Sequence, residues 1–251
     1  MAGKVIDVYL NDDAVERFGL LAPTRPERFP SRPPRAWANT VRAGLGDELH
    51  LCTQEVQRDE LRELWKADQS VHSLFWTTMA WGGMHRRHAR TLAGQEESAL
   101  RVCERLKRAD ITGTEAFEEF ASLSTCGTIP GLGPAFFTKL IFFCCPTEDS
   151  FILDQWTACS VHLLTLQARM PAVVVSKRSE IPTKISAYVS NRVTAHDYGR
   201  FCEIVLELGE RLGITGEEAE HRMFGLGGRQ RTAWRQHVME NWHEVAKRSK
   251  S

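Results

Sequence analysis

The stretch from Ile129 to Asp154, IPGLGPAFFTKLIFFCCPTEDSFILD, carries the pattern that decides the fold. Its segment 130–133, Pro-Gly-Leu-Gly, predicts a tight turn whose backbone N–H groups can approach another surface, because glycine has no Cβ. Residues 135–144 are almost wholly apolar, which predicts a helix buried on most sides. After a Cys-Pro breaker and a polar run, a short apolar segment leads to Asp154 at the predicted start of the next helix.

Lys139 is the one ionisable residue in this apolar helix. Lysine is rarely fully buried unless it is paired or used, and loss of hydration lowers its pKa toward the range of a nucleophilic neutral amine. Taken singly, Lys139 can equally extend its amine to solvent, and Asp154 can equally be a plain helix N-cap. Their joint placement beside the glycine turn favours a catalytic pair.

The order of hairpin, helix, loop and Leu-Asp resembles the helix-hairpin-helix DNA glycosylases, and among them the bacterial and archaeal 8-oxoguanine-glycosylase-like branch. In that superfamily the hairpin grips a DNA phosphate through backbone amides, and an aspartate beyond it serves catalysis. The eukaryotic 8-oxoguanine enzymes place their lysine where this chain has Ala135; Lys139 lies one helical turn later on the same face, as in the bacterial and archaeal branch. The resemblance therefore implies that Lys139 and Asp154 are catalytic. The hairpin residues that it assigns to DNA binding are Pro130, Gly131, Leu132 and Gly133.

A corner between two predicted helices runs from Trp81 to Arg87 and contains Gly82-Gly83. In related glycosylases a side chain from this corner fills the hole left by the flipped base, and a nearby arginine contacts the orphaned partner base. By this resemblance Arg87 takes the place of the arginine. Glycine replaces the asparagine of the eukaryotic enzymes, so the wedge would be Trp81, Met84 or His85. A plain helical corner with aromatic packing accounts for the same residues.

The formal net charge is zero, which argues neither for nor against nucleic acid, because DNA binding needs only a local basic surface. One basic cluster covers 85–90, and another begins at Arg222 and includes Arg229. Each alone could be a solvated helix face; together with the hairpin they favour a groove that follows DNA phosphates. Trp156 would be a phosphate or pocket contact by resemblance, or a packing residue.

The composition is that of an ordinary soluble protein of 251 residues with 42% hydrophobic content, enough for a substantial core. No apolar stretch is long enough to cross a bilayer, and the N-terminus lacks a secretory signal, which predicts a cytoplasmic protein. The seven cysteines form no CxxC pair, so no zinc site is expected. Some relatives carry a four-cysteine iron–sulfur cluster near the C-terminus, but no cysteine follows Cys202, so that cofactor is not expected either.

Two regions are predicted along the chain. Residues 1–60 form an N-terminal extension with a proline-rich connector over 22–35, which cannot form regular helix; residues 61–251 form the helical domain, with the hairpin at 129–133. The resemblance is strong from Ile129 to Trp156, weaker from about Leu64 to the C-terminus, and does not cover the first sixty residues. The predicted helices are 11–20, 53–67, 68–81, a basic helix that begins at Met84, 110–123, 135–144, 156–169, 185–212 with an interruption near 194–196, and 217–224. Residues 173–175 are a candidate extended segment.

The resemblance implies an all-α fold of two helical lobes, and a DNA glycosylase that flips out a modified base and cleaves its N-glycosidic bond. Its partner would be double-stranded DNA with a modified base, and the protein would act as a monomer at the nucleoid. The base could be oxidised guanine, in repair, or a hypermodified cytosine such as glucosylated hydroxymethylcytosine, in phage defence. A non-catalytic module that only binds DNA or a partner remains the alternative, and a helical scaffold without a nucleic-acid role is a third reading.

Overall fold

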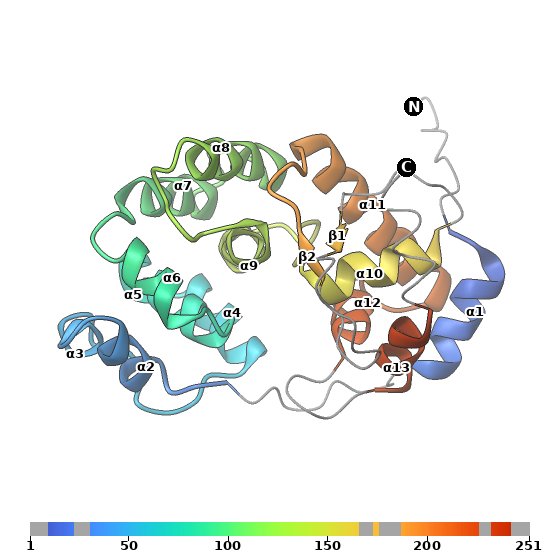
Figure 1. Ribbon diagram of the computed structural model, residues 1–251, viewed down its shortest axis with the longest axis horizontal. Coiled ribbons are helices and arrows are strands. Elements are labelled where there is room, and N and C mark those ends of the chain that lie inside the picture. Colours follow the sequence, from blue (N-terminus) through green and yellow to red (C-terminus); the bar gives the residue numbers. More distant parts are fainter. Residues whose placement is uncertain (1–9, 23–30, 166–172, 176–186, 226–231, 242–251) are drawn as a thin grey trace.

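The computed structural model describes residues 10–22, 31–165, 173–175, 187–225 and 232–241. Within these ranges, helices make up two lobes (Figure 1). One lobe is built from α2 to α9, and the other from α1, α10 to α13 and a short strand pair. The predicted all-α architecture is therefore confirmed.

The first lobe packs its helices around buried aromatic side chains, of which Trp65, Trp76 and Phe137 are fully enclosed. Local caps set several helix starts: Gln57 and Glu60 form a capping box at α4, and Thr112 and Glu115 form another at α8. The helices of this lobe are α2 (Pro34–Val41), α3 (Leu45–Glu48), α4 (Arg58–Lys66), α5 (Val71–Trp81), α6 (Arg86–Leu92), α7 (Glu97–Lys107), α8 (Gly113–Thr125) and α9 (Pro134–Cys144).

The second lobe surrounds Tyr198 and Trp234, which are both buried. A two-stranded antiparallel ribbon pairs Val173 with Val189 and lies beside α10. Its elements are α1 (Asp12–Leu21), α10 (Gln155–Leu164), β1 (Val173–Val175), β2 (Ala187–Val189), α11 (Ala195–Leu212), α12 (Gly216–Phe224) and α13 (Ala233–Glu240).

The predicted helix-hairpin-helix unit is present: α8 and α9 flank the turn at 126–133. Phe120 of α8 stacks on Phe137 of α9 with ring centroids 5.4 Å apart, and Phe117 meets the same ring edge-on at 5.0 Å. Phe117 also stacks on Tyr198 of α11 at 4.6 Å. The aromatic cluster thus fixes the unit between the two lobes.

The first sixty residues contribute to both lobes where they are described. Phe18 of α1 packs edge-on against Trp234 of α13 at 4.8 Å, and Trp37 of α2 packs against Trp76 of α5 at 6.1 Å. The boundary predicted at residue 60 therefore marks no break in the packing.

Three sequence-based predictions need correction. No helix was predicted within the connector 22–35, yet α2 begins at Pro34. Proline is tolerated in the first turn of a helix, because the N–H group that it lacks would have no partner within the helix. The helix predicted from residue 185 begins at Ala195, where Thr194 and Asp197 form a capping box, and Ala187–Val189 is a strand. The helix predicted over 53–67 begins only at Arg58.

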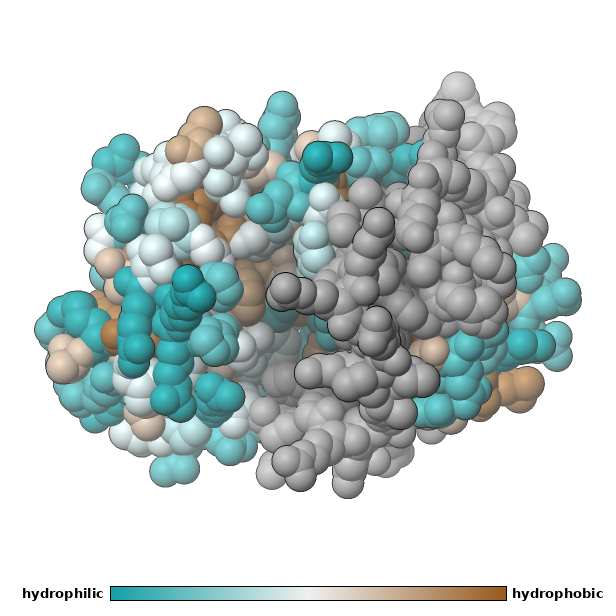
Figure 2. Space-filling model, viewed as in Figure 1, coloured by the Kyte–Doolittle hydropathy of each residue, from teal (hydrophilic) through white to brown (hydrophobic). Residues whose placement is uncertain are grey.

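No helix among the described residues is long and apolar enough to span a membrane. On the face shown in Figure 2, hydrophilic side chains cover much of the first lobe, and hydrophobic ones show mainly in its recesses. The seven cysteines are all free thiols, five of them buried and Cys52 and Cys126 exposed.

Candidate active site

A cavity of about 670 Å³ lies where the two lobes meet. The first lobe lines it with the hairpin, the start of α9 and the corner after α5; the second lobe lines it with the start of α10, β2 and α12. Its ionisable lining residues are Arg58, His88, Lys139, Asp154, Tyr188, Glu220 and His221. The predicted pair, Lys139 and Asp154, therefore opens into one cavity.

Lys139 is buried, with 7% of its surface exposed. Its Nζ donates a hydrogen bond to the carbonyl oxygen of Ala135 at 2.6 Å, within the same helix. Burial lowers the pKa of the amine below its usual range, and the nearby charges of Asp154 and Glu220 oppose that shift only in part. The sequence-based expectation of a desolvated lysine agrees with this geometry.

Gly82 provides the space through which the lysine side chain passes. A Cβ at this position would lie 2.7 Å from Cδ of Lys139 and 3.2 Å from its Cε. The backbone of Gly82 has an ordinary helical φ of −69°, so space, and not conformation, requires glycine here. This glycine belongs to the lysine's channel and does not enlarge the base pocket.

Asp154 caps α10 from the second lobe. Its Oδ1 accepts hydrogen bonds from the backbone N–H groups of Trp156 at 2.7 Å and Thr157 at 3.1 Å. The other oxygen, Oδ2, makes no hydrogen bond with any residue that the structure describes. The capping interpretation is thus correct for one oxygen, and it leaves the second free for chemistry.

The loop that carries Asp154 is fastened to the helix that carries Lys139. Thr138, next to the lysine, accepts a hydrogen bond from the backbone N–H of Leu153 at 3.1 Å. Tyr198 of α11 donates to the carbonyl oxygen of Phe151 at 2.9 Å. These buried bonds hold the amine and the carboxylate in fixed register.

The hairpin has the geometry of a close-approach turn. Gly131 has a φ of +81°, and a Cβ there would lie 2.9 Å from Cβ of His88 on α6, so both conformation and space require glycine. Leu132 is fully buried and anchors the turn, whereas Gly131 is exposed. Gly133 and Pro134 then begin α9 on the wall of the cavity, and a helix N-terminus is a favourable position for an anion.

The predicted wedge candidates differ in accessibility. Met84 is fully buried, and Trp81 is 7% exposed with its ring edge-on to Phe143 at 5.0 Å. His85 is exposed and caps α6, accepting a hydrogen bond from the backbone N–H of Arg87 at 3.2 Å. Of the three candidates only His85 is exposed, and Trp81 belongs to the wall of the cavity.

The remaining predicted contacts divide between the cavity wall and the undescribed residues. Trp156 is half-buried on the cavity wall, with the guanidinium of Arg235 3.7 Å above its ring centroid. Arg87 is exposed beside His85. Arg229 lies outside the described residues, as do most basic residues of the C-terminal cluster.

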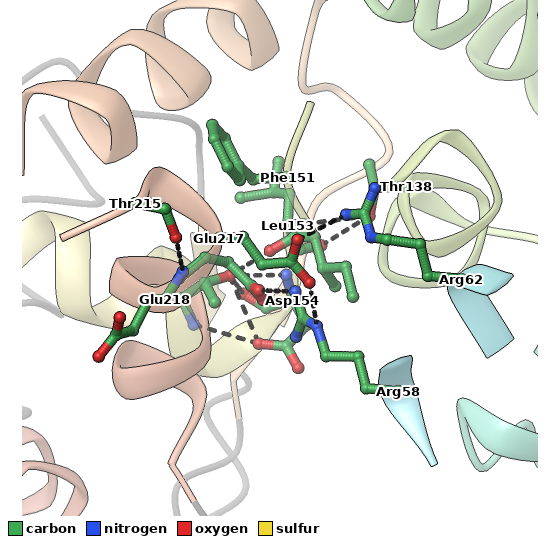
Figure 3. Close-up of polar contacts among 12 residues, drawn as sticks. Arg58, Arg62, Thr138, Phe151, Leu153, Asp154, Thr215, Glu217 and Glu218 are labelled. Carbon is green, nitrogen blue, oxygen red and sulfur yellow. Dashed lines mark hydrogen bonds and ion pairs between the residues drawn. The ribbon is translucent and has the colours of Figure 1, made fainter. Parts of the chain in front are cut away.

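A buried ion-pair network beside the catalytic pair was not anticipated from the sequence. Arg58 and Arg62 of α4 reach across the lobe boundary toward α12 (Figure 3). Arg58 donates to Glu220 and lies 3.3 Å from Oε1 of Glu217, and Arg62 lies 3.0 Å from Oε2 of Glu217. Burial raises the pKa of Glu220 to about 7, although Arg58 opposes this shift.

No sequence signal singles out these residues. Arginines four apart in α4 and glutamates three apart in α12 look like solvated helix faces. Both guanidinium groups also lie over the ring of Phe142, at 4.2 and 4.1 Å from its centroid, and Phe142 lies one turn after Lys139. Only the tertiary contact between α4 and α12 brings these residues together beside the cavity.

Comparison with known proteins gave one match. The pattern of a family described as "Putative 8-oxoguanine DNA glycosylase OGG-like protein" matches residues 23–224, well over half of the chain. The match begins in the proline-rich connector and extends further toward the N-terminus than the resemblance read from the motifs. No curated protein and no solved structure matches the chain significantly.

Proposed function

Because this chain belongs to the family of 8-oxoguanine DNA glycosylase OGG-like proteins, we propose that it excises a modified base from duplex DNA with Lys139 as nucleophile and Asp154 as its carboxylate partner. The observation that carries the proposal is the buried amine of Lys139, which opens into a cavity shared with the free oxygen of Asp154. The burial of this lysine weighs against a module that only binds DNA, because contact with phosphates uses charged side chains.

The chemistry follows from cleaving an N-glycosidic bond. The target nucleotide leaves the duplex at a cost of a few kcal/mol and enters a shaped pocket; here Trp81, Trp156 and Phe136 offer aromatic surface for the base. The neutral amine of Lys139 attacks C1′ of the sugar and forms a Schiff base, which also permits strand cleavage by β-elimination. Asp154 stabilises the positive charge that develops on the sugar.

The DNA backbone would lie along the hairpin and α6. The first amides of α9 and the turn around Gly131 would hold one phosphate, and His85 and Arg87 would face the opened base pair. This arrangement uses local contacts only, which is compatible with a net charge of zero. We expect the protein to act as a monomer, without metal or iron–sulfur cofactor, on DNA in the cytoplasm.

The identity of the base is the finer part of the proposal. Family membership favours oxidised guanine, in base-excision repair. A bulky modified cytosine, in phage defence, remains a second candidate because the cavity of about 670 Å³ is roomy. Gly82 adds no room to this cavity, because the side chain of Lys139 fills the space beside it.

Borohydride trapping tests the proposal on duplexes that carry 8-oxoguanine, uracil, hydroxymethylcytosine or its glucosylated form. The expected result is a covalent adduct on one lesion with the wild type and none with Lys139→Gln. Base release without any adduct would contradict the lysine chemistry and make Asp154 the activator of water. Neither adduct nor release, with salt-sensitive DNA binding, would favour the binding module.

A further inference from the structure

Glu220 is a buried carboxylate that the chemistry above does not use. Its side chain is fully enclosed in α12 and lines the same cavity as Lys139 and Asp154. Arg58 donates a hydrogen bond to Oε2, while Oε1 is buried with no hydrogen-bond partner among the described residues. An oxygen left in this state costs free energy, so it calls for a function beyond packing.

Joining the two lobes does not account for Glu220, because Glu217 already does so. Glu217 lies one turn earlier on the same helix and pairs with both Arg58 and Arg62 while remaining partly open to solvent. A second, wholly buried carboxylate adds a desolvation cost without adding a new connection between the lobes.

We propose that Glu220 carries a proton during the lysine reaction, taking it from Nζ of Lys139 after attack on C1′ and delivering it to O4′ when the sugar ring opens. The inference rests on the lysine chemistry of the proposed function and adds a third group to it. Its basis is the shared cavity, the buried free oxygen and the position of Glu220 across the cavity from the amine.

The proton balance closes. When Nζ bonds to C1′, the glycosidic bond breaks, its electron pair leaves with the base, and the base takes a proton from water. The hydroxide that remains balances the positive charge that stays on the Schiff base. The resulting secondary ammonium passes one proton to the carboxylate of Glu220. The nitrogen lone pair then forms the Schiff base as the C1′–O4′ bond breaks, and O4′ takes the proton from Glu220, which ends ionised as it began.

The charged surroundings support a carboxyl group that can both accept and release a proton near neutrality. The groups that face Glu220 are Arg58 from α4, Lys139 from α9, Asp154 at the start of α10 and Glu217 on its own helix. Burial raises the pKa of Glu220 to about 7 and lowers that of Lys139. Both shifts have one main cause, burial, which favours the neutral form of each group. They bring the two pKa values closer together, which favours proton exchange between the two groups.

The proton passes from Lys139 to Glu220 only through an intermediate group. Nζ of Lys139 donates to the carbonyl of Ala135 and is not hydrogen-bonded to Glu220, so one water in the cavity or the sugar itself would relay the proton. Asp154 has a different task in the proposed chemistry, in which its free Oδ2 stabilises the positive charge that develops on the sugar.

The test is the single-turnover rate of borohydride trapping on a duplex with an abasic site, followed from about pH 5.5 to pH 9. An abasic site carries a hydroxyl on C1′ in place of the base, and Schiff-base formation from its ring form still requires loss of a proton from Nζ and protonation of O4′. The test therefore requires no knowledge of the excised base. Wild type, Glu220→Gln and Glu217→Gln are compared, with melting temperature and affinity for a tetrahydrofuran duplex as folding and binding controls. Glu217→Gln is the matched control, because it removes an arginine partner from the same helix without touching the cavity.

The expected result is a rate for the wild type that rises with pH through about 7, and about a hundredfold slower trapping at neutral pH for Glu220→Gln, without that rise. Glu217→Gln should trap like the wild type. Trapping by Glu220→Gln at the wild-type rate or faster would overturn the inference, because a mere electrostatic neighbour raises the pKa of the lysine, and its removal would free the amine. An equal loss in both variants would also overturn it, in favour of a structural bridge. Failure of the wild type to form an adduct would instead overturn the proposed lysine chemistry, and this inference with it.

Discussion

The two lobes contribute opposite charges in and beside the cavity, and these charges have different partners. The first lobe supplies the cations Lys139, Arg58 and Arg62, and the second lobe supplies the carboxylates Asp154, Glu217 and Glu220. The arginines pair with the glutamates, whereas the lysine is left with a backbone carbonyl. The arginine–glutamate pairs thus connect the two lobes, whereas Lys139 remains available for reaction.

The difference between the cations has a chemical reason. Arginine stays protonated under all ordinary conditions and can stack on a ring, as Arg58 and Arg62 do on Phe142. Lysine is a compact charge whose pKa responds to burial, and the pKa of Lys139 is lowered. The positive charge of Arg58 also lowers the pKa of Lys139, although burial is the larger cause and the charge of Glu220 opposes it.

The largest predicted effect comes from removing the arginine that pairs with Glu220. Arg58→Met should lower the free energy of unfolding by about 3–5 kcal/mol, because it leaves Glu220 buried without its partner. Arg62→Met is the matched control on the same helix and should cost no more than about 1 kcal/mol, since its partner Glu217 is partly exposed. Urea unfolding of the three proteins measures both values. Equal losses would mean that stacking on Phe142, which the arginines share, dominates over the buried pair.

The raised pKa of Glu220 predicts that the stability of the protein depends on pH. The pKa of Glu220 is about 7 in the folded chain and 4.5 as a free side chain. The bound proton of Glu220 therefore stabilises the fold fully below pH 4.5, and this stabilisation is lost as the pH rises through about 7. Glutamine cannot titrate, so the stability of Glu220→Gln relative to the wild type should increase over this window by up to about 3 kcal/mol. Thermal melts across the window measure the difference, and a constant difference would show that Glu220 titrates normally in the fold.

A smaller effect is predicted where the lysine passes Gly82. Gly82→Ala places a methyl group against Cδ of Lys139 and should cost about 1–2 kcal/mol of stability. It should also slow borohydride trapping, by up to about a hundredfold if the amine is displaced. Gly83→Ala is the control: its φ of +69° brings a comparable strain, but its Cβ would meet nothing within 4 Å. An equal fall of the trapping rate in both variants would contradict the interpretation that Gly82 is needed to leave space for the side chain of Lys139.

The smallest stability effect concerns Asp154. Asp154→Ala should lose about 1 kcal/mol through the missing cap of α10, whereas Asp154→Asn keeps an oxygen for the two amides and should lose only a few tenths. Both variants lack the negative charge and should trap about a hundredfold more slowly. If the asparagine variant kept wild-type trapping, Asp154 would be a structural cap and nothing more.

Local patterns predicted the hairpin and its neighbours well. The turn at 130–133, the apolar helix α9 and the cap at Asp154 depend on residues close in the chain, namely glycines, an apolar run and a capping side chain. The same kind of signal placed α1, α5, α8 and α12 within a few residues of their observed bounds. The strand β2 was missed because its pairing partner β1 lies outside any local window.

The sequence by itself determined the helical architecture, the hairpin unit and the candidate pair Lys139 and Asp154, because turn chemistry, hydrophobic periodicity and spacing act over one or two helical turns. Only the tertiary structure decided what surrounds that pair. Arg58 and Glu220 are 162 residues apart in the chain, and each looks like an ordinary surface charge until α4 and α12 meet. Burial, which moves the pKa values of Lys139 and Glu220 in opposite directions, arises only when the two lobes close around one cavity.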